Sequence, residues 1–314
     1  MIDPGIEFEG LRHRRVPANG MDFHVAEAGE GDRLALCLHG FPELWISWRY
    51  QMPRLAQMGW RVWAPDLRGY GETGGSDRVS DYAIETLMDD VAGLIDAAAA
   101  REVMLIAHDW GGVIAWYFAL RRVRNLDRLV VMNLPHPGVL ASGGMSLRQL
   151  MHSWYVFFFQ IPGCAERVLA SREAAPIANM FTSMACHPER FPDEILDVYR
   201  QAALRPGALQ GMVNYYRAYI RGGGRRRQHA LGYPIIDVPT LFLWGEQDLA
   251  LTKETTFGTE DFVESLTLRY LPDASHWVQQ DQPEVVNEML EAWLAGERVP
   301  EAPPGPSEST SASA

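Results

Sequence analysis

The chain has 314 residues, enough for about two folding units, and its shares of hydrophobic and charged residues are those of an ordinary globular protein. Its formal net charge of −12 is the opposite of what phosphate binding needs, which excludes a nucleic acid as a general partner. Its three scattered cysteines form no CxxC pair, and no apolar run is long enough to span a bilayer, so we expect a soluble, cytoplasmic protein without membrane insertion.

From the N-terminus, short apolar or β-branched runs alternate with longer helical patterns. We expect strands at residues 14–16, 22–26, 34–38, 61–64, 103–107, 129–133, 240–244 and 267–271, and helices at 45–58, 84–99, 110–122 and 284–294. Several strands are continuously apolar, which is typical of parallel strands covered on both faces. The first two strands have no helix between them and predict an antiparallel start. The pattern as a whole predicts an α/β fold with a mostly parallel eight-stranded sheet and helices on both faces.

The alternation stops between residues 136 and 231, where aromatic, Met and helix-forming residues dominate and no strand is expected. We interpret this segment as a helical lid inserted after the sixth strand, so that the core consists of residues 1–135 and 232–296. A basic cluster in the lid, at residues 225–227, is interpreted as a solvated loop. The tail at residues 297–314 is rich in Pro, Ser, Ala and Glu, which predicts disorder.

The strongest local motif is LIAHDWGG at residues 105–112, where an apolar strand runs into a tight turn and a helix then begins. This is the pattern of a nucleophile elbow, with Asp109 in the place of the usual Ser. By itself the motif also fits an Asp that only caps the helix. A carboxylate that attacks a saturated carbon leaves an ester, which activated water can hydrolyse, whereas a Ser would leave an ether. The motif therefore favours substrates with a strained or leaving-group-bearing carbon and argues against a serine esterase.

Three further loops follow expected strands and complete this candidate site. The motif HGFPE at residues 39–43 predicts that the backbone N–H of Phe41, together with that of Trp110, forms an oxyanion hole. Asp248 and His276 follow the two last strands, which gives the chain order nucleophile, acid, base. The acid would orient the imidazole and stabilise its charged form. Glu246 is the alternative acid, whereas Asn133, after the sixth strand, cannot be one.

With these motifs in place, the chain resembles the soluble epoxide hydrolases of the α/β-hydrolase superfamily over residues 10–295. The core motifs shared in style with that family are residues 39–43, 66–72, 108–112, 245–248 and 275–277. Two lid segments add to the resemblance. YVFFFQIPG at residues 155–163 is similar to a family segment ending in Phe-Gln-x-Pro-Gly, and NYYR at residues 214–217 is similar to a second one. The resemblance implies that Tyr155, five residues before the Gln, and Tyr216, directly before the Arg, are catalytic acids.

The resemblance also implies an activity: an epoxide is converted to a vicinal diol through an ester on Asp109, which His276-activated water hydrolyses. A small-molecule epoxide would then be the partner, and no metal or organic cofactor is needed. Haloalkane and haloacid dehalogenases use the same kind of triad and remain an alternative. Phe41 stands where many haloalkane dehalogenases carry a polar residue, although some fluoroacetate-type dehalogenases share His-Gly-Phe-Pro. A non-catalytic, ligand-binding homologue is the alternative from a different class of protein.

Overall fold

The computed structural model describes residues 10–143 and 147–305. Its centre is one eight-stranded sheet with the strand order β1-β2-β4-β3-β5-β6-β7-β8. The strands are β1 (Arg12–Ala18), β2 (Met21–Ala28), β3 (Arg33–Leu38), β4 (Arg61–Pro65), β5 (Glu102–His108), β6 (Arg128–Met132), β7 (Thr240–Gly245) and β8 (Leu266–Leu271). β2 pairs antiparallel with both β1 and β4, and every other pairing is parallel. The mostly parallel sheet and its antiparallel start, both expected from the sequence, are therefore confirmed.

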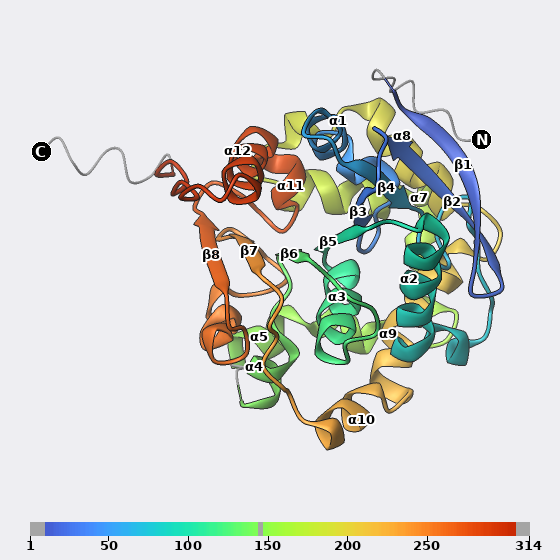
Figure 1. The fold of residues 1–314 in the computed structure, drawn as a ribbon. Coiled ribbons are helices and arrows are strands. Elements are labelled where there is room, and N and C mark those ends of the chain that lie inside the picture. The colour runs from blue at the N-terminus through green and yellow to red at the C-terminus, as the bar shows by residue number, and fades with distance from the viewer. Residues whose placement is uncertain (1–9, 144–146, 306–314) are drawn as a thin grey trace, which may run out of the picture.

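Helices cover both faces of the sheet, which explains why its central strands are continuously apolar. The core helices are α1 (Gln51–Gln57), α2 (Ile84–Ala98), α3 (Trp110–Leu120), α11 (Val278–Asp281) and α12 (Pro283–Leu294). Figure 1 shows α1, α11 and α12 on one side of the sheet and α2 and α3 on the other. The helix expected at residues 45–58 is divided into a 3-10 turn at Trp45–Trp48 and α1. With both faces covered, the edge where the parallel strands end is left for a site.

Between β6 and β7 the described residues form helices and no strand of the sheet, as expected for an insertion after the sixth strand. They are α4 (Pro137–Ala141), α5 (Leu147–His152), α6 (Trp154–Phe158), α7 (Cys164–Met184), α8 (Asp193–Ala203), α9 (Ala208–Arg221) and α10 (Gly224–Leu231). Three consecutive residues within α7, from Arg172 to Ala174, have positive φ, so α7 is interrupted there. Among the described residues, no helix combines the length and apolar character needed to cross a membrane.

The basic cluster at residues 225–227 differs from its interpretation as a solvated loop, because it lies within α10. Gly224 packs against α2, since a Cβ there would lie 2.9 Å from a side-chain carbon of Ile84. The guanidinium of Arg227 donates to both carboxylate oxygens of Glu85 on α2. This pairing ties the end of the lid to the core.

The part of the chain after α12 also differs from the expected disorder as far as the structure describes it. Val299 is buried, and the guanidinium of Arg269 on β8 donates to the carbonyl oxygens of Val299 and Pro300. One apolar side chain and one arginine thus hold residues 297–305 against the last strand. The remainder of the expected tail, residues 306–314, lies outside the described residues.

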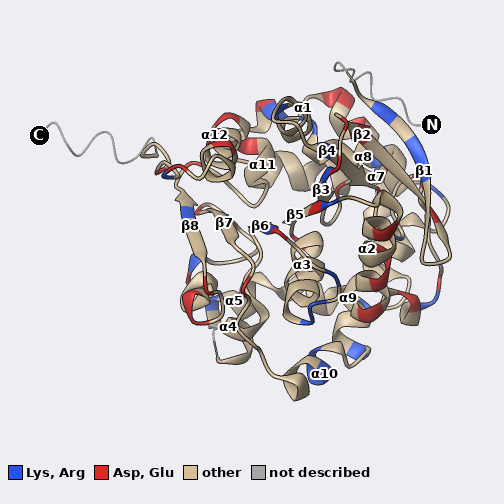
Figure 2. Cartoon of the chain, in the orientation of Figure 1, with Lys and Arg blue, Asp and Glu red and all other residues tan. Residues whose placement is uncertain are grey.

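The opposite edge of the sheet is formed by β1, which is strongly basic. Arg12, Arg14 and Arg15 all belong to this strand, and their side chains are about half exposed. Arg14 forms an ion pair with Glu27 on β2. Figure 2 shows this basic strand at the margin of the molecule.

Candidate active site

Asp109 occupies the turn between β5 and α3 and has the strained backbone of a nucleophile elbow. Its φ is +46° and its ψ is −117°, a conformation that side chains other than glycine rarely adopt. The turn brings α3 very close to β3, because a Cβ on Gly111 would lie 2.1 Å from the carbonyl oxygen of Leu38. Gly111 is thus required by the close approach of helix and strand.

The carboxylate of Asp109 is held between the loop after β3 and His276. Its Oδ1 accepts a hydrogen bond of 2.7 Å from the backbone N–H of Phe41, and its Oδ2 lies 3.7 Å from Nε2 of His276. A Cβ on Gly40 would lie 2.4 Å from Oδ1, so only glycine fits beside the carboxylate. The N–H of Trp110, the second expected oxyanion donor, makes no hydrogen bond to the Asp109 carboxylate in this structure.

Asp109 is poised as an anion. Burial alone would raise the pKa of its carboxyl, but the neighbouring His276 and the N–H of Phe41 outweigh burial and lower that pKa below its ordinary value. The start of α3 adds a favourable dipole for negative charge. The side chain is therefore an ionised, hydrogen-bonded carboxylate at neutral pH, which is the form that a nucleophile needs.

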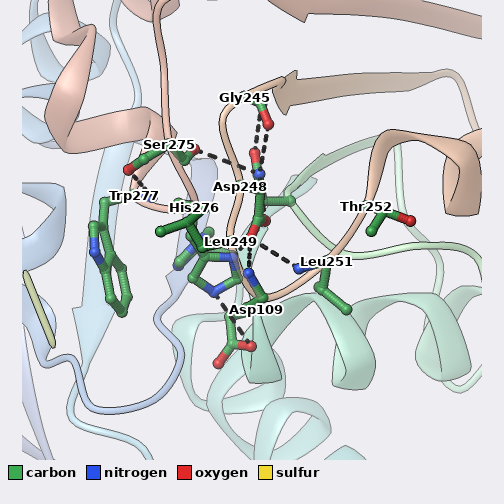
Figure 3. Close-up of polar contacts among 12 residues, drawn as sticks. Asp109, Gly245, Asp248, Leu249, Leu251, Thr252, Ser275, His276 and Trp277 are labelled. Carbon is green, nitrogen blue, oxygen red and sulfur yellow. Dashed lines mark hydrogen bonds and ion pairs between the residues drawn. The ribbon is translucent and has the colours of Figure 1, made fainter. Parts of the chain in front are cut away.

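His276 and Asp248 form a buried pair that reaches toward Asp109 (Figure 3). Nδ1 of His276 donates to Oδ2 of Asp248 at 2.7 Å. Burial disfavours the imidazolium, but the carboxylates of Asp248 and Asp109 outweigh it and hold the pKa of His276 well above its ordinary value. The arrangement is that of an acid which orients a base and stabilises its charged form.

Four hydrogen bonds fix Asp248 in the loop after β7. Oδ1 accepts from the backbone N–H groups of Ala250 and Leu251 at 2.7 and 2.9 Å, and Oδ2 accepts from Nδ2 of Asn133 at 2.8 Å as well as from His276. Burial would raise the pKa of Asp248, but His276 and these donors lower it overall. The sequence analysis considered Asn133 only as an acid and rejected it; the structure places it as a hydrogen-bond donor to Asp248.

The alternative acid, Glu246, faces a different partner. Its carboxylate forms an ion pair with Nζ of Lys253, and its side chain is partly exposed. No hydrogen bond joins it to His276 among the described residues. Of the two acids that follow β7, only Asp248 contacts the imidazole.

A second buried pair lies behind the triad and was missed by the sequence analysis. Nδ1 of His108 and Oε2 of Glu43 are 2.6 Å apart, and Nε2 of His108 donates to the carbonyl oxygen of His276 at 2.8 Å. Glu43 also accepts from the N–H of Gly40 at 2.8 Å. The pair therefore connects the loop that carries Phe41 to the loop that carries His276. The signal was the acid at the end of the motif HGFPE, which no expected interaction used.

The two lid tyrosines come from different helices and meet above Asp109. Tyr155 is half-buried on α6, Tyr216 is buried on α9, and their ring centroids are 5.9 Å apart. Burial, and secondarily the negative charge of Asp109, raise the pKa of both phenols, that of Tyr216 well above its ordinary value. Both hydroxyl groups are therefore neutral hydrogen-bond donors over the whole physiological pH range.

The motif residues around the tyrosines explain why the two lid segments occur together. Nε2 of Gln160 donates to the carbonyl oxygen of Tyr216 at 3.3 Å. Nε of Arg217 donates to the carbonyl oxygen of Phe159 at 3.0 Å, and its Nη1 pairs with Glu166 at 2.6 Å. The Gln of the first segment and the Arg of the second thus join the backbones that carry Tyr155 and Tyr216.

Two cavities meet at Asp109, with volumes of about 180 and 310 Å³. Asp109, Tyr155 and Tyr216 line both of them, whereas His276 and Phe41 line only the larger one. The other walls are mainly apolar and aromatic, as expected for a small-molecule site. Within residues 10–143 and 147–305, no group of three or more His, Cys, Asp and Glu side chains could hold a metal ion. The arrangement can place an apolar substrate between a carboxylate and two phenols, with a base alongside.

The chain is similar to many proteins of known family. The family model described as alpha/beta hydrolase fold matches residues 36–283. Epoxide hydrolase 4 of Homo sapiens is 38% identical over 292 residues, which cover 90% of this chain and 78% of that protein. The crystal structure of epoxide hydrolase A from Mycobacterium thermoresistibile has a TM-score of 0.79 and 30% identity, covering 92% of this chain and all of that one. The structure of potato (Solanum tuberosum) epoxide hydrolase I has a TM-score of 0.80 and 30% identity, with 91% and 99% covered.

Proposed function

The chain belongs to the epoxide hydrolase family of the α/β hydrolase fold, and we propose that it converts an epoxide to a vicinal diol through a covalent ester on Asp109. The observation that carries this mechanism is the position of the ionised Asp109 carboxylate and two neutral phenols on the walls of the same cavities. A carboxylate can attack a ring carbon while a phenol protonates the oxygen that leaves it.

In the first step, Asp109 attacks one carbon of the epoxide and the carbon–oxygen bond of the ring breaks. Oδ1 is held by the N–H of Phe41, so Oδ2, which faces His276, is the free oxygen for this attack. The ring oxygen leaves as a strongly basic alkoxide, which accepts a proton from Tyr155 or Tyr216. Phenols with an ordinary pKa of about 10 suit this task because they stay protonated until the alkoxide forms.

In the second step, His276 removes a proton from water, and the resulting hydroxide attacks the carboxyl carbon of the Asp109 ester. Formation of the ester removes the negative charge of Asp109, one of the two charges that raise the pKa of His276. The pKa of His276 therefore falls once the first step is complete, so the imidazolium releases its proton to solvent and the neutral imidazole is available as the base. The N–H groups of Phe41 and Trp110 stabilise the tetrahedral oxyanion, and the ester breaks to release the diol and regenerate Asp109.

The dehalogenase alternative shares the triad but not the need for the phenols. A halide leaves as a stable anion and requires no proton, whereas an alkoxide leaves poorly without one. Two phenols lie beside Asp109, raised in pKa and joined by the contacts of Gln160 and Arg217. The presence of two neutral proton donors beside the nucleophile favours an alkoxide over a halide as the leaving group.

A single turnover in heavy-oxygen water tests the ester. Water attacks the carboxyl carbon of Asp109, so the first diol takes its new oxygen from the carboxylate and carries ordinary oxygen. The heavy oxygen remains in Asp109, where peptide mass spectrometry detects it. Heavy oxygen in the first-turnover diol would mean that water attacks the epoxide directly and would reduce Asp109 to a general base.

The cytoplasmic setting expected from the sequence is also part of the proposal. Cys37, Cys164 and Cys186 are all free, which is typical of proteins that function in a reducing compartment. Fractionation of cells that express the tagged protein tests this part, and recovery from an oxidising compartment would contradict it.

A further inference from the structure

The smaller of the two cavities has a cation on its wall. Arg225, the second residue of α10, lines it together with Tyr117 and Tyr219. Of the described residues that line this cavity, Arg225 is the only basic one and Asp109 the only acidic one. The cavity thus joins an ionised nucleophile to an arginine through walls that are otherwise mainly aromatic and aliphatic.

Arg225 has no counterion among the described residues, unlike the arginine two positions later. Arg227 donates to both oxygens of Glu85 and to the carbonyl oxygen of Gly222. The contact of Arg225 is with an aromatic face, since its Cζ lies 5.6 Å from the ring centroid of Tyr219. A guanidinium stacked on a phenol keeps its N–H donors available for a planar anion.

A row of aromatic rings connects this guanidinium with the reacting end of the cavity. The ring of Tyr219, under Arg225, packs at 5.6 Å against the ring of Trp110, which directly follows Asp109. Tyr216 also packs against Trp110, at 4.9 Å. A chain of carbon atoms that starts at an epoxide beside Asp109 can follow this aromatic wall and end at Arg225.

We propose that Arg225 is an anion-binding residue that determines specificity: it selects epoxides whose apolar chain ends in a carboxylate. This inference rests on the proposed epoxide hydrolysis and names the class of substrate. The planar fork of a guanidinium matches a carboxylate with two parallel hydrogen bonds. A protein with a net charge of −12 repels anions in general, so within this cavity the guanidinium of Arg225 is the group that attracts an anion.

The neighbouring Arg226 provides a matched control. It carries the same charge one residue along α10 and is exposed like Arg225, but it does not line the cavity. If Arg225 were merely part of a solvated basic cluster, the two arginines would behave alike. A binding role predicts that they differ.

The first experiment compares a series of ω-epoxyalkanoates of increasing chain length with their methyl esters. The wild type should prefer acid over ester at one range of chain length, through a lower KM. Arg225→Gln should reduce the acid-to-ester ratio of kcat/KM by about tenfold, the lower end for a hydrogen bond to a charged group at an exposed site. Arg226→Gln should retain the ratio of the wild type. An equal fall in both variants, or a fall in neither, overturns the proposal.

The second experiment measures binding without catalysis, so that it does not depend on the proposed reaction. Calorimetric titration with straight-chain alkanoates should show binding to the wild type that weakens in Arg225→Gln and is largely kept in Arg225→Lys. The matched methyl esters should bind both proteins with similar affinity. Equal alkanoate affinity of the wild type and Arg225→Gln overturns the anion site. If the wild type binds alkanoates through Arg225 but hydrolyses no epoxide, the result counts against the proposed reaction alone.

Discussion

The two sides of the active site differ in charge and in the contacts that hold them in place. Asp109, Asp248 and His276, which we call the floor, come from loops at the ends of β5, β7 and β8 and carry charge in a buried place. Tyr155 and Tyr216, which we call the roof, come from lid helices and are neutral. The floor is held by hydrogen bonds to fixed backbone groups, whereas the roof is held mainly by aromatic packing.

The difference follows from the energetic cost of burying charge. A buried carboxylate is tolerated only when donors replace the water that it loses, and Asp248 accordingly accepts four hydrogen bonds. A neutral phenol needs no such scaffold, since its ring is stabilised by apolar neighbours such as Phe159, whose ring lies 4.9 Å from that of Tyr216. An insertion of short helices can therefore carry the acids, but the rigid sheet edge must carry the nucleophile and the base.

Replacement of His276 by Gln tests the floor with the largest expected effect. Without a base, Asp109 can still open the epoxide, but the ester cannot be hydrolysed. Steady-state turnover should fall by a factor on the order of 10⁶. Intact mass spectrometry should show the protein heavier by one substrate molecule. His152→Gln, which alters another histidine on the larger cavity, should accumulate no such adduct. Normal turnover without adduct in His276→Gln would remove His276 from the mechanism.

The change Asp248→Asn keeps the shape of the floor but removes its buried countercharge. Hydrolysis of the ester should slow by about 10⁴, because an amide neither orients nor supports the imidazolium as a carboxylate does. Formation of the ester should be affected much less, which rapid mixing with single-turnover detection can resolve. Glu246→Gln serves as control, since Glu246 pairs with Lys253. If the control is the damaging variant, the assignment of Asp248 is wrong.

The roof is tested by Tyr155→Phe and Tyr216→Phe, each of which deletes one hydroxyl and keeps the ring. Each change should slow ester formation by about 10², the low end for a lost catalytic acid, because the remaining phenol partly replaces the lost one. The double change should nearly abolish ester formation, since neither phenol is then left to supply the proton. Far-UV circular dichroism should show that the fold survives. Turnover of a haloalkane, if the chain supports any, should change only through the shape of the cavity. Full epoxide activity in the double variant would contradict the role of Tyr155 and Tyr216 as proton donors and favour the dehalogenase alternative.

The smallest expected effect is on stability: the free energy of unfolding should depend on pH through the charged floor and not through the neutral roof. The pKa of His276 is raised by folding, so its contribution to the free energy of unfolding is fully present below its ordinary pKa of about 6.5 and is lost as pH rises through the raised value. The pKa values of Asp109 and Asp248 are lowered, so their contribution is present above about 4 and is lost as pH falls through the lowered values.

Stability from the floor should therefore be greatest between about pH 4 and pH 6.5. Urea unfolding of the wild type and of His276→Gln at several pH values gives the difference directly. The matching difference for Tyr155→Phe should be flat over this range, because the phenol stays neutral. If the difference in the free energy of unfolding between the wild type and His276→Gln does not change with pH, the imidazole is not charged in the folded state.

The floor could be predicted from sequence because each of its members follows a strand. The ends of parallel strands meet at one edge of the sheet, so the chain order of Asp109, Asp248 and His276 was enough to bring them together. The roof was not predictable in this way. Within residues 155–159, helical periodicity does not reveal that Phe157 is largely exposed while Phe159 is buried, and only the family resemblance singled out Tyr155.

Other parts of the site depend on contacts that no local pattern carries. Gln279 and Gln280 donate to Glu43 across more than 230 positions of chain, and neither belongs to a motif. The packing of Val299 against β8 depends equally on Arg269, which lies in an unremarkable strand. Composition predicted disorder for residues 297–305 because their few apolar side chains carry no signal until a partner surface is known.

The basic character of β1 has a consequence unrelated to catalysis. Within residues 10–143 and 147–305, β1 is an outermost strand of the sheet. It leaves a row of backbone N–H and C=O groups that the strand of another molecule could extend, the usual route to aggregation through sheet edges. Arg12, Arg14 and Arg15 surround that row with long, hydrated side chains, and Pro17 removes one donor from the strand. These residues oppose pairing of the edge with a strand of another molecule. The first strand of the sheet thus favours solubility, although the chemistry takes place several strands away.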